Sequence, residues 1–435
     1  MKESFFQVVS IARFVETLKT FSRTATLERE IAGAFGMVLA EPVVAAEDLP
    51  LMHRSCMDGY AVRAADTFGA SESNPTYLDL AFAVAIETPS DAALEPGTCA
   101  RITTGGSLPQ GADAVVMVEQ TLEMGGQGTP EAVGGEAAGG LGGTTIEIHK
   151  SLSPWDNVML RGEDVQAGET LLQPGTRLDG ARIGLLAALG YSRVRVHAPV
   201  TVGILSTGDE VVAVDQPVRP GLVRDVNSHT LAALAEAAGA RAVRLGLVRD
   251  DLQALASALE KGLEECDVVL VSGGSSVGTR DHSLEALERL PGGEILAHGV
   301  AMSPGKPTIL ARAETDTGLK AVLGLPGQVA SAQVVMQVLV LPFLAHLQGL
   351  NHAFDPGPLE TVPARLSRNV ASRQGRTDFV RVALSRDTDG GLVATPVLGK
   401  SGLLKTLLQA QGLMEIPENR EGFTAGTEVM VRPLV

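Results

Sequence analysis

The fold is decided by a stretch that begins VTVGILSTGDE, at residues 200–210. From here to residue 350, short apolar runs alternate with longer segments of helical pattern. Strands are predicted at residues 200–205, 242–248, 267–271, 308–311 and 321–325, and helices at residues 229–238, 252–265 and 329–347. This alternation is typical of right-handed βαβ units, with a parallel sheet that helices cover on both faces. We therefore predict an α/β domain at residues 196–350.

The chain before this domain shows two other patterns. Apolar residues at helical spacing, first from Ile11 to Phe21 and then at every fourth position from Leu27 to Leu39, predict helices through the first 40 residues. From residue 51 to 150, short apolar runs lie between Gly and Pro turns, which indicates a β-rich lobe. Nine glycines between Met124 and Gly143 predict a flexible loop in that lobe. A helix is expected at residues 179–189 and a strand at residues 193–196.

The chain after the α/β domain reads as β structure again. Phe379-Val380-Arg381-Val382-Ala383-Leu384 suits a half-buried strand, and Gly390-Gly391 suits a hairpin turn. We predict a small β-barrel or sandwich at residues 351–435. The whole chain is thus a multidomain protein that combines α/β and β architecture.

Composition excludes several classes of protein. The 435 residues include 35 Lys and Arg against 51 Asp and Glu, a net charge of −16, which argues against nucleic-acid binding. A hydrophobic share of 45% and a charged share of 20% exclude a mostly disordered chain. Cys56, Cys99 and Cys266 are far apart, which rules out a disulfide framework and a structural zinc site and fits a reducing compartment.

Targeting and membrane signals are weak. The N-terminal segment has no uninterrupted apolar core followed by a small-residue cleavage site. The longest apolar run, Val329–Leu347, carries Gln333, Gln337 and Pro342, and we interpret it as a buried helix rather than a membrane span. We expect a soluble cytoplasmic protein.

Chemistry is expected where strands of the α/β domain end, because ligands collect at the carboxyl edge of such sheets. Three apolar strands run into loops of small residues, at residues 206–210, 272–281 and 326–328. Glycines there let backbone N–H groups approach an oxyanion, which favours a phosphate or a pterin-like ligand. The alternative is that the glycines only turn the chain. None of the loops has the Walker A or Rossmann spacing. The candidate ligand-binding residues are Ser206, Thr207, Gly208, Ser272, Gly273, Gly274, Ser275, Gly278, Pro326 and Gly327.

Carboxylates gather at the same loops. Asp209, Glu210, Asp225 and Asp281 could hold a divalent cation such as Mg²⁺ between anionic ligands. The alternative is structural: Asp281 would cap a helix and Asp209 would form a turn. Lys306 lies between two prolines in Ser303-Pro304-Gly305-Lys306-Pro307, a stiff loop that would fix its ammonium group.

Seven motifs in order resemble the molybdopterin molybdenumtransferase family, which includes MoeA and the gephyrin E domain. The motifs are LPLMHRSCMDGYAVRAADT at residues 49–67, RITTGGSLPQGADAVVMVEQ at 101–120, RGEDVQAGETLL at 161–172, GILSTGDEVV at 203–212, VSGGSSVGTRDH at 271–282, MSPGKPTIL at 302–310 and LGLPGQVASA at 323–332. They spread over nearly the whole chain.

The resemblance implies four domains. They are an elongated helical domain at residues 1–46 and 150–195, an inserted β-rich domain at 47–149, a MogA/MoaB-like pterin-binding α/β domain at 196–350 with a parallel-rich sheet, and a C-terminal β-barrel at 351–435. It also implies a homodimer whose active cleft lies between the α/β domain of one subunit and the β-rich lobe of the other. Further implied partners are a MogA-like adenylyltransferase and molybdoenzyme apoproteins.

The resemblance also implies a reaction: molybdate is inserted into adenylylated molybdopterin and AMP is released, with Mg²⁺ as cofactor. The matching catalytic positions are Asp58, Thr104, Asp164, Glu210, Asp225, Asp281 and Lys306, and Arg376 and Ser401 match polar positions of the C-terminal domain. Glu210, Asp225 and Asp281 are also candidate metal ligands, together with Asp209, which is proposed from its residue type and its place at the sheet edge. These carboxylates would hold the metal that neutralises the diphosphate, and a cation would receive the molybdate dianion.

The sequence departs from the family at the oxyanion loop. The family commonly has lysines where Gly299 and Ser303 stand here, which leaves Lys306 as the remaining lysine. Two alternatives follow: a tungstate-preferring enzyme, or a non-catalytic protein that binds and delivers molybdopterin.

Overall fold

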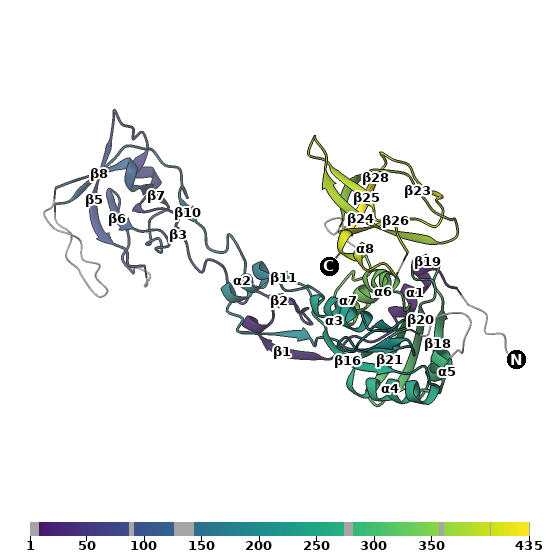
Figure 1. The fold of residues 1–435 in the computed structure, drawn as a ribbon. Helices are drawn as coiled ribbons and strands as arrows, with labels where there is room; N and C mark the ends of the chain where they lie inside the picture. The colour runs from purple at the N-terminus through teal and green to yellow at the C-terminus, as the bar shows by residue number, and fades with distance from the viewer. Residues whose placement is uncertain are drawn as a thin grey trace. The chain divides into compact units, whose positions relative to one another are not determined.

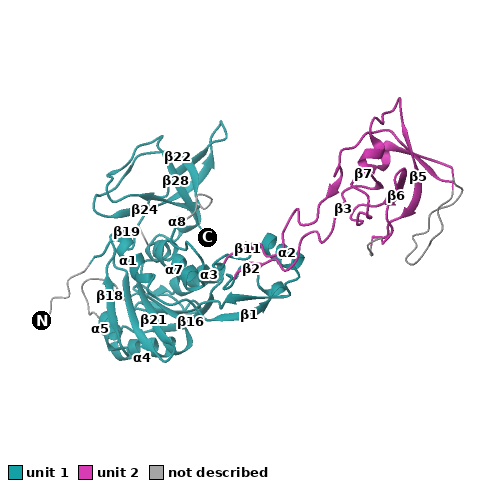
Figure 2. Ribbon diagram, turned by 180° about the vertical axis from the view of Figure 1, so that it is seen from behind, with its two compact units in different colours: residues 1–41, 174–435 teal, residues 42–173 magenta. Residues whose placement is uncertain are grey.

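The computed structural model describes residues 8–86, 91–125, 143–273, 282–355, 361–400 and 402–434. The chain divides into two compact units (Figure 2), one of residues 1–41 with 174–435 and one of residues 42–173. The first unit contains the α/β domain and the C-terminal β domain, and the second is the β-rich lobe. The finer four-domain division stays a prediction.

A six-stranded sheet forms the centre of the α/β domain (Figure 1). Its strand order is β16-β13-β17-β21-β20-β18. The strands are β13 (Thr201–Thr207), β16 (Arg241–Val248), β17 (Val268–Ser272), β18 (Glu294–His298), β20 (Ile309–Thr315) and β21 (Gly318–Leu325). The first four in the order are parallel to one another. The predicted strand regions at residues 200–205, 242–248, 267–271 and 321–325 are confirmed.

Two separate apolar cores cover the two faces of this sheet. Alternate residues of β17 show the division, because Val268 and Leu270 join one core whereas Val269 and Val271 join the other. Helices α1 (Ile11–Leu18), α3 (Asn227–Ala237), α6 (Val329–Val335) and α7 (Leu341–Leu347) pack on the first face, and α4 (Leu252–Glu265) and α5 (His282–Arg289) pack on the second (Figure 1). The predicted two-faced α/β architecture is confirmed.

One strand predicted as parallel is antiparallel. β20 pairs antiparallel with β21, and β18, which the sequence did not predict, pairs antiparallel with β20. Thr315 faces Gly318, so only a tight turn joins β20 to β21. A connection that short cannot cross over to a parallel neighbour, so this edge of the sheet is a hairpin.

The apolar segment Val329–Leu347 is a core helix, as predicted. It is the one helix in the described part of the chain that is long and apolar enough to span a membrane, and Val335, Met336 and Leu339 are fully buried in the domain core. A π-helical segment, η4 (Met336–Val340), separates α6 from α7. Pro342, the second residue of α7, has no N–H to donate, which interrupts the regular helical ladder.

The predicted helix at residues 27–39 is wrong. Residues Thr26–Glu30 form strand β1, which pairs antiparallel with β12 (Arg193–His197), and Ile31–Gly33 form a short 3₁₀ helix, η1. Glu28 accepts a 2.9 Å hydrogen bond from Arg193 across this pair. Pairing with a strand that is distant in sequence therefore overrides the apolar spacing. The predicted helices at residues 11–21 and 179–189 form as α1 and α2 (Gly180–Ala188).

The C-terminal β domain is a closed barrel. Five strands pair in the order β24-β25-β22-β28-β26, and β26 pairs again with β24 to close the ring. They are β22 (Val362–Leu366), β24 (Thr377–Arg386), β25 (Leu392–Pro396), β26 (Gly412–Ile416) and β28 (Glu428–Pro433), with β23 (Val370–Ala371), β27 (Gly422–Phe423) and α8 (Lys405–Gln409) attached. The predicted hairpin turn at Gly390-Gly391 joins β24 to β25. Of the two predicted forms, the barrel is correct.

The unit of residues 42–173 is built on a six-stranded sheet of order β7-β4-β6-β5-β9-β8. Its strands are β4 (Gly59–Val62), β5 (Thr76–Ala83), β6 (Thr98–Ile102), β7 (Ala114–Met117), β8 (Thr121–Met124) and β9 (Thr145–Ile148). Short pairs add β2 (Val43–Val44) with β11 (Thr170–Leu172) and β3 (Arg54–Ser55) with β10 (Val158–Met159). The predicted β-rich lobe is confirmed, and most of its glycine-rich segment lies outside the described residues.

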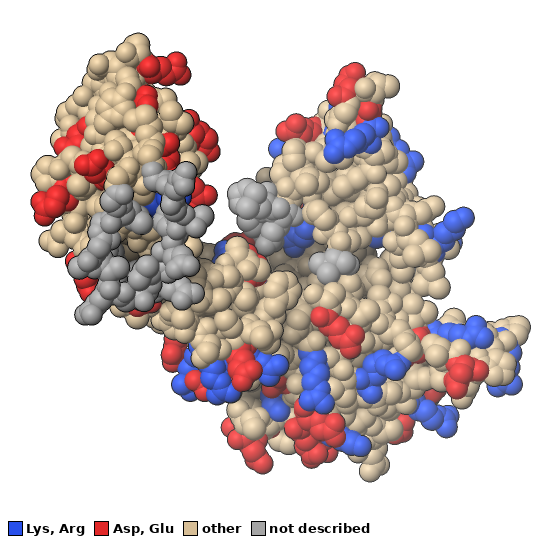
Figure 3. Space-filling model, turned by 90° about the vertical axis from the view of Figure 1, so that its left-hand side faces the viewer, with Lys and Arg blue, Asp and Glu red and all other residues tan. Residues whose placement is uncertain are grey.

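Acidic and basic side chains are interspersed along the lower edge of the face drawn in Figure 3, whereas acidic side chains predominate on its upper left part. The ion pairs of β1 with β12, which include Glu28 with Arg193, show the same mixing. A large basic surface is therefore not a feature of that face, and anion recognition there depends on local groups.

Candidate functional site

The carboxyl edge of the α/β sheet brings together the described first residues of three predicted loops. They follow β13, β17 and β21. Gly273 has a φ of +116°, and a Cβ atom there would lie 2.1 Å from the carbonyl oxygen of Thr207. A Cβ atom on Gly327 would lie 3.6 Å from the Cα of Gly273. The backbones of these segments are in direct contact. Position 273 therefore requires glycine for two reasons: its φ is positive, and there is no space for a Cβ atom.

Asp225 is buried at this edge, with 7% of its surface exposed. Its Oδ1 atom accepts hydrogen bonds from the Ser206 hydroxyl at 3.0 Å and from the Ser228 N–H at 3.0 Å. The second bond satisfies an N–H group in the first turn of α3. Asp225 therefore joins the end of β13 to the start of α3, and one of its two carboxylate oxygens serves the fold.

Asn227 is a site residue that the sequence reasoning missed. Its Nδ2 group donates to the Ser272 hydroxyl at 2.6 Å and to the Gly327 carbonyl at 2.9 Å, so it ties the β17 loop to the β21 loop. The signal was available, because Asn227 stands two residues after Asp225 in the motif RDVNSH.

Two polar atoms at this edge are buried and have no hydrogen-bond partner among the described residues. They are Oδ1 of Asn227 and the hydroxyl oxygen of Thr207. Such groups cost free energy unless something pairs with them, and most buried polar atoms in proteins are paired. A polar ligand or water at this edge would satisfy both.

The predicted carboxylates do not form a compact group in the described residues. Asp209 and Glu210 are exposed, and Asp209 accepts a 3.4 Å hydrogen bond from the Asp250 N–H. In the described part of the chain, no three His, Cys, Asp or Glu side chains are grouped so that they could hold a metal ion. Asp281 lies outside the described residues, as do Gly274, Ser275, Gly278 and Ser401. The metal assignment stays a prediction.

The loop that carries Lys306 lies beside the barrel. The Thr308 hydroxyl donates to the Gly305 carbonyl at 2.7 Å, which closes the turn around Lys306, and this lysine is exposed. Before the turn, strand β19 (Met302–Ser303) pairs with the start of β24 and sets Ser303 opposite Asp378. Arg376 makes a 2.9 Å ion pair with Asp378. The structure thus places Arg376 in the segment next to the Ser303 loop.

In the unit of residues 42–173, the structure brings Asp58 and Thr104 together. The Thr104 backbone N–H donates to Asp58 Oδ1 at 2.7 Å, and its hydroxyl donates to the same oxygen at 3.0 Å. These two bonds lower the pKa of Asp58, with the backbone bond as the larger cause. Asp164 is exposed, and its N–H donates to the Leu49 carbonyl at 3.1 Å.

Comparison with known proteins shows to which family the chain belongs. Three family models match in order: the MoeA N-terminal region (domains I and II) over residues 9–190, a probable molybdopterin binding domain over 203–346, and the MoeA C-terminal region (domain IV) over 363–434. The molybdopterin molybdenumtransferase of Bacillus subtilis is 33% identical over 90% of this chain and 86% of its own. The chain belongs to the MoeA family. The resemblance seen in the sequence is confirmed.

Other MoeA relatives agree with this assignment. A putative molybdopterin biosynthesis protein of Methanocaldococcus jannaschii is 32% identical over 93% of this chain and 91% of its own. The crystal structure of the molybdopterin biosynthesis MoeA protein of Pyrococcus horikoshii covers 99% of this chain and 100% of its own, with 32% identity and a TM-score of 0.77.

The backbone conformation explains why glycine, and not the lysine common in the family, stands at position 299. Gly299 has a φ of +106°, in the left-handed region that side chains other than glycine rarely adopt. A lysine at position 299 would strain this backbone. Ser303 is held in the β19–β24 pair and carries no such restriction.

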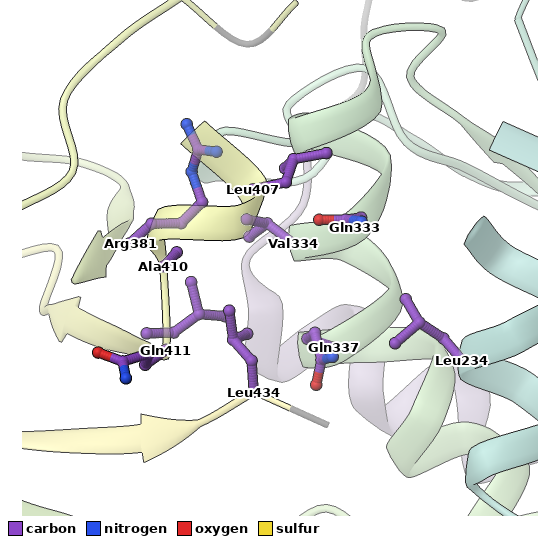
Figure 4. Close-up of a pocket in the computed structure, with 10 residues that line it drawn as sticks. Leu234, Gln333, Val334, Gln337, Arg381, Leu407, Ala410, Gln411 and Leu434 are labelled. Carbon is purple, nitrogen blue, oxygen red and sulfur yellow. The ribbon is translucent and has the colours of Figure 1, made fainter. Parts of the chain in front are cut away.

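The chain also has a cavity of about 370 Å³ (Figure 4). None of the residues that line this cavity was predicted as a site residue. Helices α3 and α6 form one side, and barrel residues form the other. Gln333 and Gln337 reach it from the helical side, and Arg381 from the barrel side. Arg381 is buried, which lowers its pKa, and it donates a 2.8 Å hydrogen bond to the Thr406 hydroxyl. Sequence periodicity cannot reveal a cavity between two domains.

Proposed function

We propose that this protein is a molybdopterin molybdenumtransferase, which inserts molybdate into adenylylated molybdopterin and releases AMP. Membership of the MoeA family over nearly the whole chain supports the proposal. One structural observation carries it: at the carboxyl edge of the α/β sheet, three glycine loops meet around buried polar atoms of Thr207 and Asn227 that have no partner among the described residues.

The chemistry of this edge suits a phosphorylated pterin. Backbone N–H groups beside Gly208, Gly273 and Gly327 would bind phosphate oxygens, since glycine permits close approach. Asn227 Oδ1, which has no hydrogen-bond partner among the described residues, would accept a hydrogen bond from an amino group such as that of a pterin ring, and the Thr207 hydroxyl would donate or accept one. Lys306 supplies a positive charge for the incoming molybdate dianion.

The proposal includes a Mg²⁺ ion that the protein and the substrate bind together. The described residues offer no three-ligand cage. Mg²⁺ is commonly held by one or two carboxylates together with substrate phosphates, and Asp225 and Glu210 could supply those carboxylates. When bound, the ion would neutralise negative charge on the diphosphate of the substrate. We therefore expect Mg²⁺ to bind tightly only when the adenylylated substrate is present.

The test is an AMP-release assay. Purified protein is incubated with adenylylated molybdopterin, Mg²⁺ and molybdate, and AMP is separated by chromatography, with a molybdate-free reaction as control. AMP that appears only with molybdate supports the proposal. Bound pterin without AMP at any molybdate concentration would contradict it.

The non-catalytic alternative can be separated with one substitution. Ser303→Lys restores one family lysine without entering the left-handed backbone at Gly299. If the parent releases no AMP and Ser303→Lys does, the parent is a molybdopterin-binding protein. Molybdate and tungstate in parallel reactions distinguish a tungstate-preferring enzyme.

The proposal also includes a homodimer, a cytoplasmic location, a MogA-like adenylyltransferase that supplies the substrate, and molybdoenzyme apoproteins that receive the product. Family membership supports these points. Light scattering coupled to size-exclusion chromatography tests the first of them.

A further inference from the structure

Trp155, the single tryptophan of the chain, is held in an unusual backbone conformation. Its φ is +70°, and Asn157, two residues on, has a φ of +59°. Bulky residues rarely adopt this region, and such strain is most often kept at functional sites. The side chain is nevertheless 43% exposed, so burial in the core does not explain why a tryptophan is kept there.

A second ring lies against Trp155. The ring centroids of His53 and Trp155 are 5.0 Å apart, and the two planes meet at 41°. The His53 Nδ1 atom accepts a 3.0 Å hydrogen bond from the Arg161 N–H, which fixes the imidazole. Arg161 in turn pairs with Asp48 at 2.6 Å. The two rings therefore form a supported aromatic surface rather than a mobile side chain.

Hydrogen bonds connect this surface to the Asp58–Thr104 pair within the same unit. The Cys56 N–H donates to the Asn157 carbonyl at 2.9 Å, so the Trp155 loop is tied to a residue two positions before Asp58. The Gly105 N–H donates to the Ser55 carbonyl at 2.8 Å, so the turn that follows Thr104 is tied to strand β3. One short network thus positions both the aromatic surface and the predicted site residues.

We propose that Trp155 and His53 form a stacking platform for a fused heteroaromatic ring of the substrate. The proposal rests on the proposed function and deepens it, because adenylylated molybdopterin offers two such rings, the adenine and the pterin. Both have a flat π-face that an exposed tryptophan binds.

Fluorescence gives a direct test, because Trp155 is the only tryptophan and reports on one place. The full-length protein is titrated with AMP in one arm and with pterin-6-carboxylic acid in the other, while calorimetry measures binding of the same compounds. Saturable quenching of Trp155 is expected with one of the two, and the arm that shows it identifies the ring.

Substitutions separate stacking from a structural role. Glycine tolerates the left-handed backbone, so Trp155→Gly should keep the melting temperature and weaken binding of the active probe about tenfold in calorimetry, as loss of one stacking partner does. Trp155→Phe keeps a ring and should retain most of the affinity. Tyr77→Leu removes another exposed aromatic residue of the same unit, on β5, and should change neither measurement.

The proposal is overturned if neither probe quenches Trp155 at millimolar concentration, or if Trp155→Gly binds as tightly as the parent. Its failure is distinct from failure of the proposed function. AMP release with an unchanged KM in Trp155→Gly would leave the transferase activity standing and remove the platform. Saturable quenching without any AMP release would support the platform and contradict the transferase activity.

Discussion

Asp58 shows how a single exposed carboxylate is kept ionised. Both hydrogen bonds from Thr104 favour the charged form, so the pKa of Asp58 lies below its ordinary value. A depressed folded-state pKa means that the contribution of Asp58 to stability is present above its unfolded pKa and is lost as the pH falls through its folded pKa.

Thr104→Val tests this explanation, because it removes the hydroxyl bond and leaves the backbone bond. We expect the pKa of Asp58 to rise toward its ordinary value without loss of the fold. Carbon-detected NMR titration of the side-chain carboxyl measures it, with Thr121→Val as control, since the Thr121 hydroxyl donates to the Val118 carbonyl. An Asp58 titration unchanged in Thr104→Val would show that the hydroxyl bond is not made in solution.

Asp225 requires two substitutions because it serves both fold and predicted chemistry. Asp225→Ala leaves the Ser206 hydroxyl and the Ser228 N–H without their acceptor, which should cost about 1–3 kcal/mol of unfolding free energy. Asp225→Asn keeps an acceptor oxygen and loses the charge. We expect Asp225→Asn to unfold near the parent temperature and to lose roughly tenfold or more in kcat/KM for AMP release. Full activity in Asp225→Asn would leave Asp225 with only a structural role.

At the scale of elements, the loop after β17 depends on one glycine. Gly273→Ala places a Cβ atom 2.1 Å from the Thr207 carbonyl oxygen and also strains a φ of +116°. Gly318→Ala, in the β20–β21 turn, strains a similar φ of +111° but has no atom within 4 Å of its new Cβ. Comparison of the two variants therefore separates the cost of the steric clash from the cost of the strained φ.

Urea unfolding measures the difference. Gly318→Ala should cost about 1–2 kcal/mol, the usual cost of a left-handed backbone for a residue with a Cβ atom. Gly273→Ala should cost more than about 3 kcal/mol, because the β13 and β17 loops must also move apart. Equal losses in the two variants would mean that the Thr207 carbonyl and Gly273 are not in close contact in solution.

The elements that could be predicted are those whose pattern is set locally. Strands at residues 200–205 and 267–271 and the helix at 252–265 follow directly from apolar runs and amphipathic spacing. The region 27–39 failed because its strand forms against β12, far away in the sequence. The site shows the same limit: glycine loops and Asp225 could be found by type and position, whereas the role of Asn227 depends on the loops that it joins in space.

At the scale of the whole molecule, the chain places its predicted site residues in two compact units. Asp58, Thr104 and Asp164 belong to the unit of residues 42–173, and Asp225 and Lys306 belong to the other. All three cysteines are free, so no disulfide contributes to either unit. Non-covalent contacts therefore stabilise both units, with burial of their apolar cores as a main contribution.

The unit of residues 42–173 has its own cores on the two sides of its sheet. Tyr60 and Val62 of β4 pack into one core, and Ala61 between them packs into the other. We predict that residues 42–173, expressed alone, fold cooperatively, because these cores and the six-strand sheet come from within the segment. Thermal unfolding followed by circular dichroism should give a single transition, and NMR should still show the depressed pKa of Asp58. A segment without dispersed amide signals would mean that the lobe depends on the rest of the chain to fold.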